Sequence, residues 1–124
     1  MDEYEEALYK LASDTLAFGP VLASQVADKL ESGYVLRYGH RDYCGMGMAM
    51  NEKKEFLYAE IWDSGFSEPR IFPSKDLFVA WLVQQSTSSL ARLDDAPFFR
   101  GNQVITRKRL LEFIAPDYPV LDFV

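Results

Sequence analysis

The sequence contains a single histidine, His40, and a single cysteine, Cys44, among its 124 residues. A zinc site built on histidine and cysteine normally needs three or four such ligands, so the chain cannot supply one. A lone cysteine forms no disulfide within the chain, which fits a reducing compartment. No apolar run approaches the roughly 18 residues of a membrane span. The start, Met1–Glu6, is acidic and not a basic leader. We therefore expect a cytoplasmic protein with no membrane partner, metal or cofactor.

Positive charge is also scarce, because the formal net charge is −6 and the isoelectric point is about 4.7. A chain with this balance repels the phosphate backbone of nucleic acids. The basic cluster Arg107-Lys108-Arg109 is a weak signal for nucleic-acid binding within an acidic chain. The charge therefore argues against a nucleic-acid partner.

Apolar residues make up 48% of the chain and aromatic residues 15%. A chain of this length and composition can bury a hydrophobic core without disulfides. The length predicts a single domain over residues 1–124. We divide it into a helical N-terminal part (1–31), an antiparallel sheet (34–72) and C-terminal helices (74–114).

Hydrophobic periodicity defines the expected elements. Helical spacing predicts helices over 3–17 and 20–31, and the acids near the N-terminus suit the start of a helix dipole. A period of two predicts strands over 34–38, 44–50 and 56–62, with a short last strand over 70–72. Ser74 and Thr106 are the predicted N-caps of two further helices, the second over 107–114, with a break over 86–89.

These elements predict an α+β fold in which helices pack on an antiparallel sheet of three to five strands, in the order ααβββ(β)αα. Met46, Met48 and Met50 share one face of their strand, and we interpret them as core residues in preference to an adaptable binding surface. Gly45 and Gly47 alternate with them. We expect a helix to pack closely on this smooth glycine face.

Catalytic patterns are weak. His40, Asp42 and Cys44 lie close together in the sequence, but the fold, not sequence proximity, normally assembles a nucleophile and its base. Glu60 and Asp63 offer a carboxylate pair for acid–base chemistry, with solvated surface residues as the default interpretation. We therefore expect no catalytic residues and no enzymatic activity.

A different role for the acids is recognition of a basic partner, since complementary charge speeds encounter and selects against wrong partners. The candidates are acids on predicted turns and strand ends. They are Asp42, Glu60, Asp63, Glu68, Asp94 and Asp95.

Three stretches carry a resemblance to a known group of proteins. They read Tyr38-x-His40-Arg41-x-Tyr43-x-Gly45-x-Gly47, Phe72-x-Ser74-x-x-x-Phe78-x-x-Trp81-Leu82-x-Gln84-Gln85-Ser86-x-x-Ser89-Leu90, and Phe98-x-x-x-Asn102-Gln103-x-Ile105-Thr106-x-x-Arg109-Leu110-x-x-Phe113. The chain from Tyr38 to Phe113 resembles bacterial proteins encoded beside polymorphic toxins, including the immunity proteins of contact-dependent growth inhibition systems.

The resemblance implies a structural role for its motifs. Trp81, Leu82, Ile105 and Leu110 would lie in the core, and Asn102-Gln103 would satisfy backbone groups near the last helix. It implies an immunity protein that binds and neutralises a cognate toxin C-terminal domain, which we expect to be basic and a nuclease. A monomer in a 1:1 complex is expected in preference to a dimer.

Two other function classes stay open. An acidic type III secretion chaperone, usually dimeric, would have the same size and charge, and an exposed apolar groove would favour it. A small enzyme that uses Glu60 or Asp63 as general base would need a deep pocket around these acids and His40.

Overall fold

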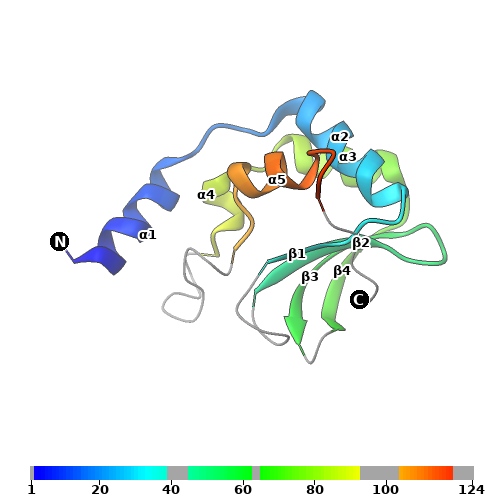
Figure 1. Ribbon diagram of the computed structural model, residues 1–124, viewed down its shortest axis with the longest axis horizontal. Coiled ribbons are helices and arrows are strands. Elements are labelled where there is room, and N and C mark those ends of the chain that lie inside the picture. The colour runs from blue at the N-terminus through cyan, green and yellow to red at the C-terminus, as the bar shows by residue number, and fades with distance from the viewer. Residues whose placement is uncertain (1, 39–44, 63–64, 93–103, 119–124) are drawn as a thin grey trace.

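The computed structural model describes residues 2–38, 45–62, 65–92 and 104–118 (Figure 1). The helices within these ranges are α1 (Glu3–Ser13), α2 (Gly19–Glu31), α3 (Lys75–Val83), α4 (Thr87–Leu90) and α5 (Arg107–Phe113). The strands within them are β1 (Leu36–Tyr38), β2 (Met46–Met50), β3 (Phe56–Trp62) and β4 (Gly65–Phe72). None of these helices is long and apolar enough to cross a lipid bilayer.

The strands form one antiparallel sheet in the order β1-β2-β3-β4. Helices α2, α3 and α5 lie over one face of this sheet, whereas α1 stands away from the sheet beside α4 (Figure 1). The predicted α+β fold is confirmed, and the four strands fall within the predicted range.

Capping side chains set the starts of the C-terminal helices, as predicted. The Ser74 hydroxyl accepts a hydrogen bond from the Leu77 amide at 3.2 Å, and the Thr106 hydroxyl accepts one from the Arg109 amide at 3.2 Å. The expected break after the third helix is present, because α3 ends at Val83, but residues 87–90 form a further short helix, α4. Ser86 opens α4 with a capping box, in which its backbone and side chain exchange hydrogen bonds with Ser89.

Two element boundaries also differ from expectation. The first helix ends at Ser13, not near residue 17, because the backbone beyond it bonds to other elements: Asp14 accepts from the Ser88 amide, and Phe18 donates to the Gln85 carbonyl. The last strand starts at Gly65, well before residue 70, because pairing with β3 overrides the local turn signals of Gly65 and Pro69.

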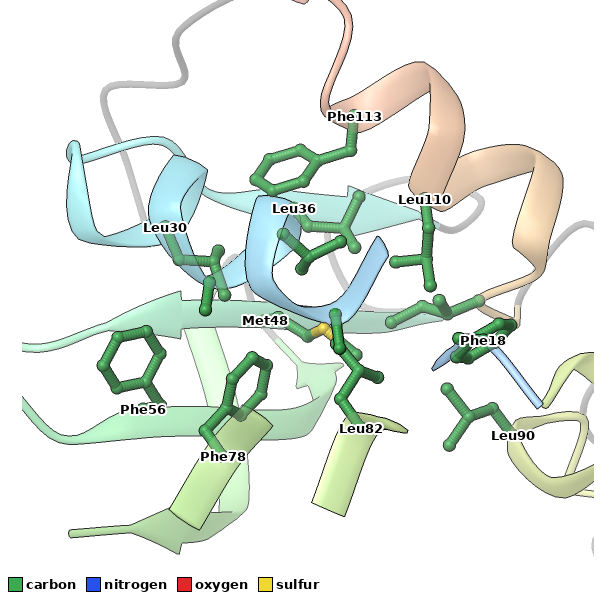
Figure 2. Packing of buried hydrophobic residues seen from close by; sticks show 14 of the residues in the cluster. Phe18, Leu30, Leu36, Met48, Phe56, Phe78, Leu82, Leu90, Leu110 and Phe113 are labelled. Atoms are coloured by element: carbon green, nitrogen blue, oxygen red, sulfur yellow. The ribbon is translucent and has the colours of Figure 1, made fainter. Parts of the chain in front are cut away.

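The methionine face of β2 is core, as predicted. Met46 and Met48 are buried in the core cluster, and Met50 packs against it half-buried. Figure 2 shows Met48 among the core side chains. The other largest fully buried side chains that pack in the same cluster are Leu30, Leu36, Phe56, Phe78, Leu82, Ile105, Leu110 and Phe113. Burying each such side chain stabilises the fold by roughly 1.5–3 kcal/mol.

The expectation of a helix against the glycine face is wrong. A Cβ atom on Gly47 would lie 2.7 Å from the Leu36 carbonyl oxygen and 2.9 Å from the ring of Phe66. The close neighbour is therefore an aromatic side chain of β4, within the same sheet. Ala49 and Ala59 are buried beside Gly47 on this face, so small residues here make room for the ring.

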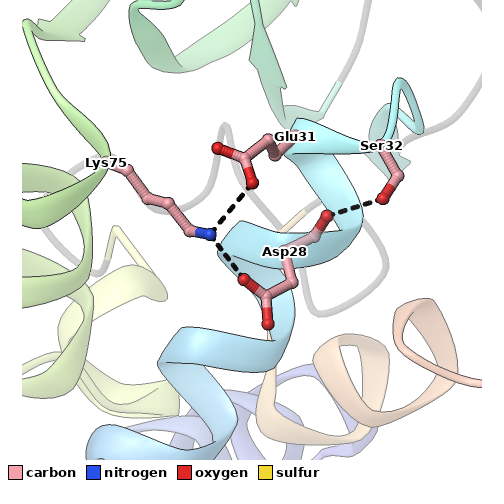
Figure 3. A network of polar contacts seen from close by, with 4 residues as sticks. All are labelled: Asp28, Glu31, Ser32 and Lys75. Atoms are coloured by element: carbon pink, nitrogen blue, oxygen red, sulfur yellow. Dashed lines mark hydrogen bonds and ion pairs between the residues drawn. The ribbon is translucent and has the colours of Figure 1, made fainter.

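An ion-pair cluster joins α2 to α3. The Lys75 ammonium lies 2.6 Å from the Asp28 carboxylate and 3.1 Å from that of Glu31 (Figure 3). The hydrogen bonds to Asp28 and Glu31 raise the pKa of Lys75 above its usual 10.5. These groups are largely exposed to solvent, so solvent screening keeps their contribution to stability small.

The arginines of the basic cluster at the start of α5 form hydrogen bonds within the chain. The Arg107 guanidinium donates to the carbonyl oxygens of Leu16 at 2.9 Å and Ala17 at 2.8 Å, which holds the segment between α1 and α2. Arg109 donates to the Val104 carbonyl just before α5. Both arginines therefore have structural partners within the chain.

Candidate functional site

A hollow of about 400 Å³ opens between the β3–β4 hairpin and helices α3 and α4. We call it the hairpin hollow. Its lining carries four charged side chains: Glu60 on β3, Glu68 and Arg70 on β4, and Arg92 just after α4. Small-molecule pockets in proteins have volumes of roughly 300–1,000 Å³. The hollow is large enough to hold one partner side chain or a small molecule.

A β-bulge shapes this part of the hairpin. Glu60 pairs with Ser67 and Tyr58 pairs with Arg70, so two residues of β4, Glu68 and Pro69, lie opposite a single residue of β3. A bulge bends its strand and changes the direction of the side chains around it. Pro69 fits here because the register leaves it without a partner in β3, and because β4 is an edge of the sheet within the described residues.

Backbone strain concentrates at the hairpin hollow. Glu68 has a φ of 44° and Arg92 a φ of 56°, and both line it. The left-handed region costs a non-glycine residue roughly 1–2 kcal/mol. Among the residues that the structure describes, the remaining non-glycine case is Lys54, in the β2–β3 turn. Strained residues of this kind cluster at functional sites, so we take the hollow as the candidate site.

Aromatic rings form one wall. The ring centroids of Tyr58 on β3 and Trp81 on α3 are 5.2 Å apart, and Phe72 lies 4.9 Å from Trp81. The Arg70 guanidinium lies over Trp81 at 5.4 Å and over Phe72 at 5.2 Å, in cation–π geometry. This wall is therefore already a surface on which a guanidinium group rests.

The Tyr58 hydroxyl is held in its neutral form. Burial raises the pKa of Tyr58 to about 12, although the positive charge of Arg92 partly lowers it. At neutral pH the hydroxyl therefore keeps its proton and can both donate and accept a hydrogen bond.

The rim of the hairpin hollow is fixed by hydrogen bonds of its own. The Ser89 hydroxyl donates to the Gln85 side-chain oxygen at 2.9 Å, and the Gln85 side-chain nitrogen donates to the Trp81 carbonyl at 3.1 Å. These bonds connect α3 to α4 and lock two lining side chains. A site supported in this way is organised before any partner arrives.

The two carboxylates at the hollow differ in their partners. Glu60 lies 4.0 Å from the Arg92 guanidinium, at the outer limit of an ion pair. Arg92 also donates to the Met46 sulfur at 3.1 Å. Within the described part of the chain, Glu68 forms no hydrogen bond or ion pair, and its side chain is exposed. Glu68 is therefore the lining carboxylate that has no partner among the described residues.

The structure brings together two of the six acids predicted to bind a partner. Glu60 and Glu68 line the same hollow. The other four, Asp42, Asp63, Asp94 and Asp95, lie outside the described residues, as do His40 and Cys44. An enzyme was expected to have a pocket lined by Glu60, Asp63 and His40. Of these three residues, the structure describes only Glu60.

Sequence reasoning missed the rest of the lining. Trp81 was expected in the core with Leu82, Ile105 and Leu110; the last three are fully buried, whereas Trp81 is half-buried and forms the wall. Asn102 and Gln103 fall outside the described ranges. The sequence feature that could have indicated the hollow was Pro69, because a proline within a strand marks an edge strand or a bulge.

Metal ligands do not gather in the part of the chain that is described, where no three His, Cys, Asp or Glu side chains are placed to share an ion. Comparisons with protein-family models, with curated proteins and with solved structures find no match to this chain. The hairpin hollow therefore has to be interpreted from its own chemistry.

Proposed function

We propose that the protein is a cytoplasmic immunity protein that binds a cognate bacterial toxin domain and neutralises it by stoichiometric occlusion. The observation that supports this most is the meeting of Glu60 and Glu68 with Tyr58 and Trp81 in the hairpin hollow. Tyrosine, tryptophan and arginine are enriched among the residues that dominate the binding energy of protein interfaces, in pockets that the complex closes off from water. Such a hollow provides an anchor for a side chain of the toxin.

The charge of the chain supports a basic partner. The net charge of −6 attracts a cationic domain over long range, which raises the rate of encounter. A toxin that cleaves nucleic acid has a cationic substrate cleft, and an acidic protein seated there keeps the substrate out. We propose a monomer in a 1:1 complex, without enzymatic turnover, cofactor, nucleic acid or membrane.

Co-expression tests the proposal. The protein is produced together with the product of the gene immediately upstream, and growth and co-purification are scored. Rescue of growth together with a stable 1:1 complex is the expected result. A toxic upstream product that the protein neither binds nor neutralises would overturn the proposal.

A secretion chaperone is the second candidate, because large apolar side chains are exposed on α1, on the segment that follows it and on α5. Tyr9 and Leu16 are 64% and 68% exposed, and Leu111 borders an open hollow of about 550 Å³. Co-purification with a secreted, non-toxic protein, together with a dimer in sedimentation analysis, would favour the chaperone over the immunity protein.

A further inference from the structure

The chemistry of the hairpin hollow indicates what it binds. Its four charged side chains sum to zero, but they are not equally engaged. Arg70 rests on the rings of Trp81 and Phe72, and Arg92 contacts Met46 and approaches Glu60. Glu68 forms no hydrogen bond, ion pair or ring contact with any described residue, so its carboxylate is the charged group of the hollow left to bind a cation of a partner.

We propose that the hairpin hollow is a receptor for one arginine side chain of the partner protein. This inference rests on the proposed function and specifies how the partner is recognised. The guanidinium group donates to the carboxylates of Glu68 and Glu60, and the side chain packs against the aromatic wall of Tyr58 and Trp81.

Arginine fits this site better than lysine does. A guanidinium is planar and weakly hydrated, stacks on aromatic rings and carries five donors in a fixed fork that matches carboxylates. Arg70 shows that such rings accept a guanidinium, and its ring contacts are with Trp81 and Phe72, which leaves the Tyr58 ring for the partner. The Tyr58 hydroxyl, which forms no hydrogen bond within the described part of the chain, can accept a further donor. A lysine ammonium is a compact point charge that uses neither the fork nor the ring face.

The test is a nuclear magnetic resonance titration of the full-length protein with N-acetylarginine methylamide. The readouts are the Trp81 indole resonance, assigned with a Trp81→Phe variant, and the Glu68 amide resonance. The matched control ligand is the citrulline analogue, which has the same shape without the charge. We expect saturable shifts at millimolar concentrations for arginine and none for citrulline.

Two variants give the test its specificity. Glu68→Gln removes the charge with little change in shape, and we expect it to weaken the arginine interaction about tenfold. Glu52→Gln makes the same change in the exposed β2–β3 turn and should leave the interaction unaltered. Equal shifts with citrulline, binding of N-acetylaspartate methylamide instead, or full binding to Glu68→Gln would overturn the inference.

The titration needs no toxin, so its outcome is separate from that of co-expression. Growth rescue with no arginine binding would overturn the inference that the hollow binds arginine, but it would still support the immunity function. Arginine binding with no rescue would support the receptor and overturn the toxin as its partner.

Discussion

The rings of Trp81 on α3 and Tyr58 on β3 lie 5.2 Å apart. Through this contact the helix layer and the sheet meet at the wall of the hairpin hollow. Aromatic pairs at such distances contribute roughly 0.5–1.5 kcal/mol beyond the area that they bury. The same pair therefore supports the fold and presents the surface on which we propose that a partner is bound.

The first prediction concerns the titration of Tyr58. Its pKa is raised to about 12, whereas an unfolded chain ionises tyrosine near 10.0. The folded state therefore holds this proton longer, so its contribution to stability is intact below pH 10.0 and falls as pH rises toward 12. In an absorbance titration of the seven tyrosines, Tyr58→Phe should remove a late-titrating component.

Tyr118 provides the control for that experiment, because burial raises its pKa as well. Tyr118→Phe should remove a different component and leave the one near pH 12 in place. If Tyr58→Phe instead removed a component near the ordinary value, the burial of the Tyr58 hydroxyl would be contradicted.

The second prediction concerns the link between α2 and α3. Lys75→Met removes the ion pairs to Asp28 and Glu31 and should lower the free energy of unfolding by no more than about 1 kcal/mol. The pKa of Lys75 is raised in the folded state, so its contribution is present below 10.5 and is lost as pH rises through the folded pKa.

Urea denaturation of wild type and Lys75→Met at neutral and at alkaline pH measures this difference. The gap between the two proteins should shrink above pH 10.5 and in high salt. Lys53→Met, an exposed lysine in the β2–β3 turn, should show no such gap at any pH. A gap for Lys75→Met that persists at alkaline pH would mean that packing, not charge, explains the effect.

The third prediction concerns the contact between β4 and β2. Gly47→Ala places a Cβ atom 2.7 Å from the Leu36 carbonyl oxygen and 2.9 Å from the Phe66 ring. Because the carbonyl is backbone and cannot rotate away, we expect a loss of about 1–3 kcal/mol in unfolding free energy. The double variant Gly47→Ala/Phe66→Leu should recover only part of that loss. An unchanged melting temperature for Gly47→Ala would contradict the close approach.

The fourth prediction concerns the strained residue at the bulge. Glu68→Gly places the residue that tolerates a φ of 44° at this position and should stabilise the protein by roughly 0.5–1 kcal/mol. Lys54→Gly, at a φ of 63°, should give a similar gain in the β2–β3 turn. Chemical denaturation of both variants tests this, and a loss of stability in Glu68→Gly would show that the Glu68 side chain stabilises the fold.

The α+β class, the helix caps and the methionine face of the sheet could all be predicted from the sequence. These features depend on local rules: period two at Met46 and Met48, and capping hydroxyls at Ser74 and Thr106. Such rules depend on residues that are close together in the chain, so they can be applied to a single sequence. Tertiary hydrogen bonds then overrode them at the end of α1, where the Ser88 amide donates to the Asp14 carbonyl.

The hairpin hollow could be predicted only in part. Glu60 and Glu68 were identified by charge and by their position near strand ends, and the structure places both at the hollow. The bulge that separates Tyr58–Arg70 pairing from Glu60–Ser67 pairing depends on the register between two strands, which no local pattern specifies. For the same reason the half-buried position of Trp81 could not be distinguished from a core position.

The most direct test of the central claim is the affinity of the hairpin hollow for its partner, measured by calorimetry with the toxin domain that co-purifies. Wild type is compared with Glu68→Gly and Lys54→Gly, two substitutions that relieve the same backbone strain at different places. We predict that Glu68→Gly binds at least about tenfold more weakly, because a charge-assisted contact is lost, while Lys54→Gly binds like wild type. Wild-type affinity in Glu68→Gly would contradict the account.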